Sequence, residues 1–297
     1  MKRCLFLAVL LLVPLPCFAQ YSFTTIDYPG AAITRLIGLN DHYEMVGHYI
    51  MPGQGQVRHA FKYSRGEFEA LDSAGVLGTY ESAANQINNR GEITGWYSDA
   101  PGTRHGYVLR DGVVNTIDYP GTTFTQVNGV TDTGIVFGHF RDASLVVHGF
   151  TLREGVFTPI DVPGALNTFP FYINTRGDVA GECNEVSGQI GHGFVLTHDG
   201  GWVQFDAPGA PPNSTLAIGI NDRRQILGYY RQSSGQPRAF VVGLDDVLLA
   251  DGYTLIDLPG TGSTPETANN AGVFVGFYTD AAGTHGLIAD PIGRSSF

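Results

Sequence analysis

Five histidines recur along the chain in similar local sequences, and histidine is the side chain that most readily binds metal ions or transfers protons near neutral pH. They are His59, His105, His148, His192 and His285. No two of them have the short spacing, such as i and i+4, that brings two ligands to one ion. We therefore predict that each bonds to the backbone of its own segment, and that the chain binds no metal ion and no cofactor.

A second set of residues could form a polar ligand site, because these residues differ from one another at otherwise similar positions. They are Arg35, Tyr80, Glu81, Asn167, Asn213 and Glu266. Arg35, Glu81 and Glu266 carry the ionisable groups that acid–base chemistry needs. A carboxylate pair within about 10 Å would favour a glycoside-cleaving site. The alternative is a solvated channel lining, and the sequence assigns no catalytic residue.

These positions follow an internal repeat, which is the first feature to establish in any long chain. An aspartate, mostly in the pattern Asp-x-Pro-Gly, returns every 43 to 51 residues, at Asp27, Asp72, Asp118, Asp161, Asp206 and Asp257. A second position, called the landmark below, is occupied by Asn40, Asn88, Thr131, Asn174, Asn221 and Asn269. A glycine always lies seven residues after the landmark and a hydroxyl residue six before it. Six copies with several fixed positions indicate one structural module.

Each copy reads as four short strands rich in β-branched and aromatic residues. In the second copy these strands are predicted at 82–87, 92–97, 105–110 and 113–118. The landmark Asn and a following Gly favour a tight turn. Asp-x-Pro-Gly favours a type II turn, because Pro fixes φ and Gly accepts positive φ. We expect the Asp carboxylate to accept the backbone N–H groups of that turn.

Four strands in about 45 residues is the period of a β-propeller blade. The sequence therefore predicts an all-β fold, a six-bladed β-propeller of four-stranded blades over residues 20–290, followed by a tail at 291–297. The chain begins with a lone strand and ends after the third strand of the sixth copy. We expect residues 22–27 to pair with 285–290 in the last blade and to close the ring, which removes two exposed edges.

The repeats resemble the bacterial extracellular repeats of the HAF family. His59-Ala60-Phe61 matches the motif that gives the family its name, and the segment from Ile87 to Gly95 matches its INxxGxIxG element. The chain departs from the pattern at Thr131, at Tyr43 and Arg224 where glycine is expected, and at Arg238 in place of His. It also departs at 73–74, where Ser-Ala replaces x-Pro. The resemblance implies export and repeat architecture, and it implies no activity.

Residues 1–19 have the basic start, apolar run and small-residue cleavage pattern of a signal peptide. We expect a secreted or periplasmic protein without a membrane span, and a monomer. Of the three cysteines only Cys183 lies outside this segment, so no internal disulfide is expected. The formal net charge of −11 argues against nucleic acid as a partner, because phosphate contacts need a basic surface.

Function is expected on the face that carries the loops that vary between copies, and at the mouth of the channel they surround. The innermost strands add the polar residues Asn85, Gln126 and Asn128. The residues after the invariant glycines are expected to pack between blades, or alternatively to form a ligand platform. These are His48, Trp96, His139, Glu182, Tyr229 and Phe277. We expect a non-enzymatic binding or surface-interaction protein whose partner is a glycan or an extracellular protein. The alternative is a polysaccharide hydrolase or lyase with acidic residues at the channel mouth.

Overall fold

The computed structural model describes residues 21–72, 80–186 and 190–292. The predicted signal peptide lies outside these residues, as do positions 73–74 and most of the predicted tail. The described residues form β-strands and one short 3-10 helix, η1, at Leu244–Asp246 in the insertion of the fifth repeat. No helix among them is long and apolar enough to span a membrane. The predicted all-β class is confirmed.

Every repeat supplies its strands in the predicted order. The first three repeats contain β2 (Ile33–Leu39), β3 (Met45–Ile50), β4 (His59–Ser64), β5 (Glu67–Ala70), β6 (Glu81–Ile87), β7 (Ile93–Ser98), β8 (His105–Arg110), β9 (Val113–Ile117), β10 (Thr125–Val130), β11 (Val136–Arg141), β12 (Val147–Arg153) and β13 (Val156–Ile160). The last three contain β14 (Asn167–Ile173), β15 (Val179–Asn184), β16 (His192–Leu196), β17 (Trp202–Phe205), β18 (Thr215–Ile220), β19 (Gln225–Arg231), β20 (Pro237–Gly243), β21 (Thr254–Ile256), β22 (Thr261–Ala268), β23 (Phe274–Thr279) and β24 (Thr284–Pro291). The N-terminal strand is β1 (Tyr21–Ile26).

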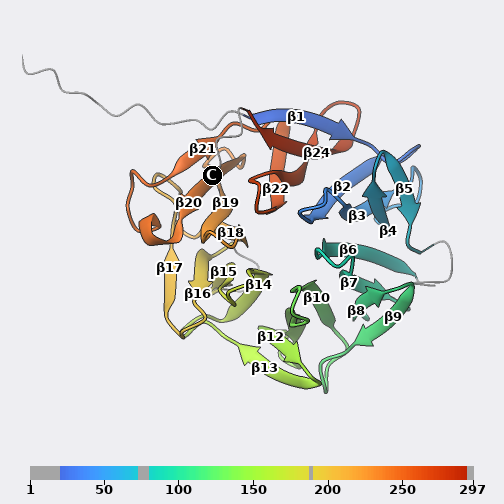
Figure 1. The fold of residues 1–297 in the computed structure, drawn as a ribbon, viewed down its shortest axis with the longest axis horizontal. Coiled ribbons are helices and arrows are strands. Elements are labelled where there is room, and N and C mark those ends of the chain that lie inside the picture. The colour runs from blue at the N-terminus through green and yellow to red at the C-terminus, as the bar shows by residue number, and fades with distance from the viewer. Residues whose placement is uncertain (1–20, 73–79, 187–189, 293–297) are drawn as a thin grey trace, which may run out of the picture.

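The strands form antiparallel sheets in a propeller-like arrangement around a common centre (Figure 1). Four sheets have four strands each, and these are β6–β9, β10–β13, β14–β17 and β18–β21. The other eight strands belong to one continuous sheet, in which β2–β5 joins the set β22, β23, β24 and β1. A single parallel pair, Ile33 with Thr284, makes that join. The sheets therefore differ from the six separate four-stranded blades that the sequence predicts.

The first strand of the chain lies against the last. β1 pairs antiparallel with β24 from Tyr21–Pro291 to Ile26–Gly286, close to the predicted pairing of 22–27 with 285–290. The innermost strands β2, β6, β10, β14, β18 and β22 each contact the next, and β22 contacts β2 (Figure 1). Apolar clusters fill the space between neighbouring sheets, such as Val108 of β8 with Val127 of β10 and Phe150 of β12. These contacts hold the inner strands around the centre.

The turn at the landmark position is built as predicted, and it also links neighbouring repeats. The Oδ1 of Asn88 accepts the backbone N–H groups of Arg90 and Glu92, which closes the turn between β6 and β7. Its Nδ2 donates to the carbonyl of Thr131 in the next repeat. Where glycine is missing, Tyr43 and Arg224 still adopt φ of 60°. These two side chains therefore occupy the left-handed region that glycine would adopt without strain.

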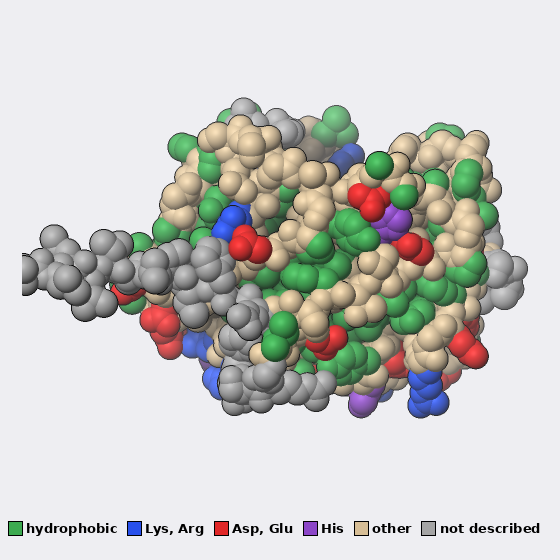
Figure 2. Space-filling view, turned by 90° about the horizontal axis from the view of Figure 1, so that it is seen from above, with side chains coloured by type: hydrophobic (Ala, Val, Ile, Leu, Met, Phe, Trp, Pro, Cys, Tyr) green, Lys and Arg blue, Asp and Glu red, His purple; other side chains and the backbone are tan. Residues whose placement is uncertain are grey.

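The histidines bond to carboxylates, which corrects the prediction of backbone partners. Each donates its Nδ1–H, over 2.6 to 3.1 Å, to the Asp that ends the neighbouring outer strand; the pairs are His59–Asp72, His105–Asp118, His148–Asp161, His192–Asp206 and His285–Asp27. In the fifth repeat Arg238 pairs with Asp257 at 2.9 Å. Arg thus replaces His as the donor and keeps the corner intact. A histidine beside acidic side chains is visible in Figure 2.

The same corner explains the hydroxyl residue in the four copies that carry threonine there. Ser82 and Ser263, in the other two copies, make different bonds. The backbone N–H after Asp27 belongs to Tyr28, and it donates to Thr34 Oγ1 at 2.9 Å. The equivalent bond joins Tyr119 to Thr125. The Asp carboxylate was expected to accept such N–H groups, but it binds the histidine while the hydroxyl takes the N–H. The Asp-x-Pro-Gly segment is thus a structural corner, as the sequence indicates, held by different bonds from those expected.

Candidate functional site

A β-bulge interrupts the innermost strand of every repeat at the same place. In β6, for example, the pairing register shifts between Ala84 and Gln86, so Asn85 has no opposite partner. The six bulged residues are Ile37, Asn85, Asn128, Phe171, Ile218 and Glu266. Bulges often turn a side chain away from the regular alternation of a strand, near functional sites in particular. All six residues here line one central cavity.

The invariant glycines make room for these bulges. A Cβ placed on Gly95 would lie 2.0 Å from the carbonyl oxygen of Ala83, and one on Gly138 would lie 2.0 Å from that of Gln126. The bulge pushes the inner strand's carbonyl against the second strand at this point. Only glycine fits there, which is why the sequence keeps it in all six copies.

The cavity has a volume of about 240 Å³ and a mixed lining. Four amides, Asn85, Gln86, Gln126 and Asn128, lie on its wall with the aromatic residues Phe171, Tyr172 and Tyr229. The amides are held by the frame around them: Asn85 donates to the carbonyl of Val127 at 2.8 Å, and Gln126 donates to Asn128 Oδ1 at 3.0 Å. The wall is therefore polar and fixed in position.

Glycines alternate with larger side chains in the ring of residues that directly follow the bulges. Two residues before the landmark, the repeats carry Gly38, Gln86, Gly129, Tyr172, Gly219 and Thr267 in turn. A Cβ on Gly129 would lie 1.7 Å from Gln86 Oε1, so the glycine leaves space for its neighbour's amide. Gln86 Oε1 and Thr267 Oγ1 are buried and have no hydrogen-bond partner among the described residues.

Glu266 is the acidic group of the cavity. Its carboxyl lies between the repeats that contribute Ile37 and Ile218 to the same ring, and burial raises its pKa to about 7. The positive charge of Arg35 offsets part of that rise. A carboxyl with this pKa is partly protonated near neutral pH and can donate as well as accept a hydrogen bond.

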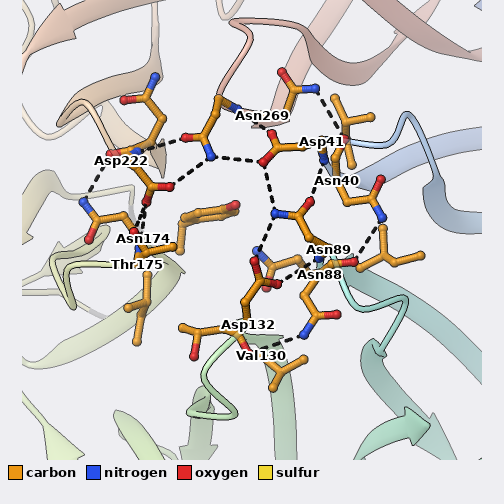
Figure 3. A pocket seen from close by; sticks show the side chains of 18 of the residues that line it. Asn40, Asp41, Asn88, Asn89, Val130, Asp132, Asn174, Thr175, Asp222 and Asn269 are labelled. Carbon is orange, nitrogen blue, oxygen red and sulfur yellow. Dashed lines mark hydrogen bonds between the residues drawn. The ribbon is translucent and has the colours of Figure 1, made fainter.

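A second, smaller pocket lies on the other side of Gln86 and Tyr172, at the landmark turns (Figure 3). One residue after the landmark, the repeats carry Asp41, Asn89, Asp132, Thr175, Asp222 and Asn270. Asp41 Oδ2 accepts from the side-chain amides of both Asn89 and Asn270. Asp132 and Asp222 accept from the same amides on the other side, at 3.0 Å. These carboxylates already have protein donors, so the pocket is a structural belt.

Arginines gather at the opposite mouth and stack on aromatic rings. Trp96 lies between two guanidinium groups, with Arg58 5.5 Å and Arg104 3.7 Å from its ring centroid. Phe124 lies between Arg104 at 4.6 Å and Arg141 at 4.1 Å. Arg35 stacks separately on Phe277, in the sixth repeat, at 4.2 Å. Cation–π contacts of this kind fix the orientation of a guanidinium group.

The structure brings only part of the predicted site together. Glu266 lines the cavity, and Arg35 lies close enough to affect its charge. Glu81 begins β6, lies near Arg104, and is not among the residues of the cavity wall.

The remaining predicted residues have local roles. Tyr80 is exposed, and Asn213 lies in an exposed turn with φ of 55°. Asn167 is buried. Its Oδ1 accepts a hydrogen bond from the backbone N–H of Val147, and its Nδ2 donates one to Asn184 Oδ1. None of these three lines the cavity. Position near the start of an inner strand was therefore a poor guide to the site, because the bulge lies deeper in the strand.

The six residues that directly follow the invariant glycines pack mostly inside the molecule, as predicted. His48 and His139 are buried, and burial lowers the pKa of each to about 3, so both rings are neutral. Glu182 is also buried and accepts the backbone N–H of Gly191. Tyr229 reaches the cavity wall, which is the part of the platform alternative that the structure supports.

Sequence reasoning missed the apolar half of the cavity. Ile37, Phe171 and Ile218 were passed over because they are not polar, although they occupy the position of Asn85 and Glu266, three residues before the landmark. An alignment of the six copies on that position would have grouped them. The alternation of Asp with Asn or Thr after the landmark was an equally readable signal.

No protein-family model matches the chain, and no curated protein sequence matches it. A solved structure of a streptogramin B lyase is similar over 90% of this chain and 97% of its own, with 10% identity and a TM-score of 0.52. A mutant of AofleA from Arthrobotrys oligospora is 12% identical over 92% of this chain and 84% of its own, with a TM-score of 0.49. A lectin of Aleuria aurantia is 10% identical over 80% and 78%, with a TM-score of 0.46. At these identities a likeness concerns the fold alone.

Proposed function

We propose that the protein is an exported, non-enzymatic binding propeller that holds one unit of a glycan in its central cavity. The proposal treats the eight-stranded sheet as two blades, so that six blades surround the channel and β1 completes the last blade. What supports this reading is the pairing of β1 with β24 and the single residue pair that joins the two halves of that sheet. The HAF resemblance and export remain part of the proposal on sequence grounds.

The observation that carries the proposal is the composition of the cavity wall. Amide groups both donate and accept, so Asn85, Asn128 and Gln126 suit the hydroxyl groups of a sugar. Phe171 and Tyr229 supply apolar surface for the carbon face of a ring. The volume of about 240 Å³ is below the ~300–1,000 Å³ of pockets for drug-sized ligands. A single sugar unit, at the end of a longer chain or as a branch, fits that size better.

The hydrolase alternative has less support. Glycosidases use two carboxyl groups in different roles, separated by about 5 to 10 Å. Among the described residues, Glu266 is the one carboxyl group that lines the cavity. Glu81, its expected partner, lies near the arginines at the mouth. A binding role needs no second carboxylate.

A glycan array with the mature protein, followed by calorimetric titration of any hit, tests the proposal. Ile37→Trp should fill the cavity and abolish binding, because Ile37 lines it and is half-buried. Val113→Trp is the matched control, since Val113 is 60% exposed on an outer strand. We expect both variants to fold and only the control to bind. If no sugar binds the wild-type protein, or if both variants bind equally, the proposed site is wrong.

A further inference from the structure

The arginine cluster at the cavity mouth is unusual for an acidic protein. Arg58, Arg104 and Arg141 alternate with Trp96 and Phe124 in one continuous stack that crosses three repeats. The chain has only 17 basic residues against 28 acidic ones. A random distribution of so few cations would not place three of them in one stack, with Arg35 close to Arg58 in the same repeat.

These arginines form no direct salt bridge of the kind that other arginines have, although Glu81 lies near Arg104 and Glu266 lies near Arg35. Arg110 pairs with Glu92 at 2.6 Å, and Arg224 pairs with Asp178 at 3.1 Å. Within the part of the chain that the structure describes, no carboxylate lies within 4.0 Å of Arg35 or of the three stacked arginines. Like charges held together without partners cost free energy, so the arrangement favours an anion that comes from outside.

The stack leaves donors free and fixes them in space. Arg104 uses its Nη1 to donate to Gln126 Oε1 at 2.8 Å, and burial together with the nearby Arg58 lowers the pKa of Arg104 to about 10. Arg141 is exposed at the outer end. A guanidinium held flat against a ring keeps its edge available for bidentate bonds to a carboxylate or sulfate.

The stack is continuous with the central cavity. Gln126, the acceptor of Arg104, is also part of the cavity wall. Arg35 lies near both Glu266 and Arg58, so it joins the stack to the acidic group of the cavity. A chain-like ligand with one unit in the cavity would therefore pass the guanidinium groups on its way out.

We infer that the ligand is an anionic glycan, an oligosaccharide that carries carboxylate or sulfate groups on successive sugars, with its charged units along Arg58, Arg104 and Arg141. This inference rests on the proposed function and adds the charge of the ligand. Nucleic acid is disfavoured because the net charge is −11, whereas binding to a phosphate backbone needs an extended basic surface.

The direct test compares ligands that differ only in charge. The wild-type protein is titrated calorimetrically with oligogalacturonate and with its methyl ester. The two ligands have the same sugar chain, but the ester has neutral groups in place of the carboxylates. Dextran sulfate and dextran make the same comparison for sulfate. We expect the charged member of at least one pair to bind at least tenfold more tightly, with an affinity that falls as salt is raised. The tighter pair identifies the anionic group.

The variants test the position of the charges. Arg141→Gln and Arg58→Gln should each weaken binding of the charged ligand about tenfold. Arg153→Gln is the matched control, because it removes the same charge from an exposed arginine at the C-terminal end of β12. This variant should bind the charged ligand as tightly as the wild type does. Arg141→Lys keeps the charge and loses the planar fork, so an intermediate affinity is expected.

The outcomes separate the two proposals. Equal binding of charged and neutral sugars would overturn this inference and leave the proposed function standing. Absence of binding to all four carbohydrates would overturn both. Equal weakening by Arg153→Gln, or tighter binding of single-stranded DNA than of any of these sugars, would also overturn the inference.

Discussion

The odd and even repeats share one backbone, but at the centre of the molecule their side chains are opposites. The odd repeats carry glycine two residues before the landmark and Asp one residue after it; these are Gly38, Gly129 and Gly219, and Asp41, Asp132 and Asp222. The even repeats carry Gln86, Tyr172 and Thr267, and Asn89, Thr175 and Asn270. Gly129 leaves space for Gln86 of the neighbouring repeat, and the Asp side chains accept hydrogen bonds from the amides of the neighbouring repeats. The functional unit of the packing is therefore a pair of repeats.

Repeats that look alike in sequence therefore differ at the centre of the molecule, where the side chains of one repeat complement those of its neighbours. Identical repeats with Asp at this position would place six carboxylates around one narrow ring, where they would repel one another and lack hydrogen-bond donors. Alternation allows Asp41 to accept from Asn89 and Asn270 at once. The four predictions below test this arrangement, from the largest expected effect to the smallest.

The glycines of the odd repeats should not be equivalent. Gly129→Ala places a methyl group 1.7 Å from Gln86 Oε1 and 2.4 Å from Phe137, so we expect a loss of about 3 kcal/mol in unfolding free energy. Gly219→Ala is the matched control, because its nearest neighbour would be 3.8 Å away. It should be neutral or stabilising by about 0.5 kcal/mol. Urea denaturation of both variants measures the difference, and equal losses would contradict the packing described.

Glu266 should make stability depend on pH, because the equivalent positions in the adjacent odd repeats are apolar. Its folded-state pKa of about 7 lies above the unfolded value near 4.5, so stability should fall as pH rises between these values. Glu266→Gln resembles the protonated acid. The variant should nearly match the wild type at pH 4.5 and be more stable by about 3 kcal/mol at pH 8. Equal pH profiles would show that the carboxyl is not desolvated.

The carboxylates of the odd repeats should be needed as double acceptors. Asp41→Asn leaves an amide group facing the amides of Asn89 and Asn270, so we expect a loss of about 2 kcal/mol. Asp251→Asn, at an exposed position, should have little effect. Thermal and urea unfolding of the two variants give the comparison. A stable Asp41→Asn protein would show that the belt contributes little.

We expect the smallest effect on stability from the His–Asp pairs at the corners. The fifth repeat has Arg238 where the sixth has His285, and this difference allows a direct comparison. Burial alone would lower the pKa of His285, but its bonds to Asp27 and Asp280 outweigh this and raise it. Its stabilisation is thus present below the unfolded value near 6.5 and is lost as pH rises through the folded value. His285→Arg, which copies Arg238 of the fifth repeat, should remove this loss. We expect less than about 1 kcal/mol, measured by urea unfolding from pH 6 to 9.

The strands of each repeat could be predicted from the sequence, but the residues that line the cavity could not. Strand order and the landmark turn follow from local patterns, because Asn88 specifies the bonds of its own turn. The pairing of β1 with β24 follows from the place of the lone first strand in the repeat pattern. The bonds of the Asp-x-Pro-Gly corner and the joining of eight strands into one sheet were not predicted. The cavity depends on bulges, and a bulge moves residues such as Ile37 and Glu266 by one position in the strand without a distinct local signal. The arginine stack joins residues from three repeats, and no local pattern places Arg58 beside Trp96.

The alternation around the narrow ring also limits how such a chain can change in length. Asn270 of the sixth repeat donates to Asp41 of the first, so the last repeat must be of the opposite type to the first. Loss or duplication of one repeat would bring two glycines or two acids together at the seam. Recombination within this gene should therefore succeed only in steps of about ninety residues, which makes the pair, and not the single copy, the unit that evolution can add or delete.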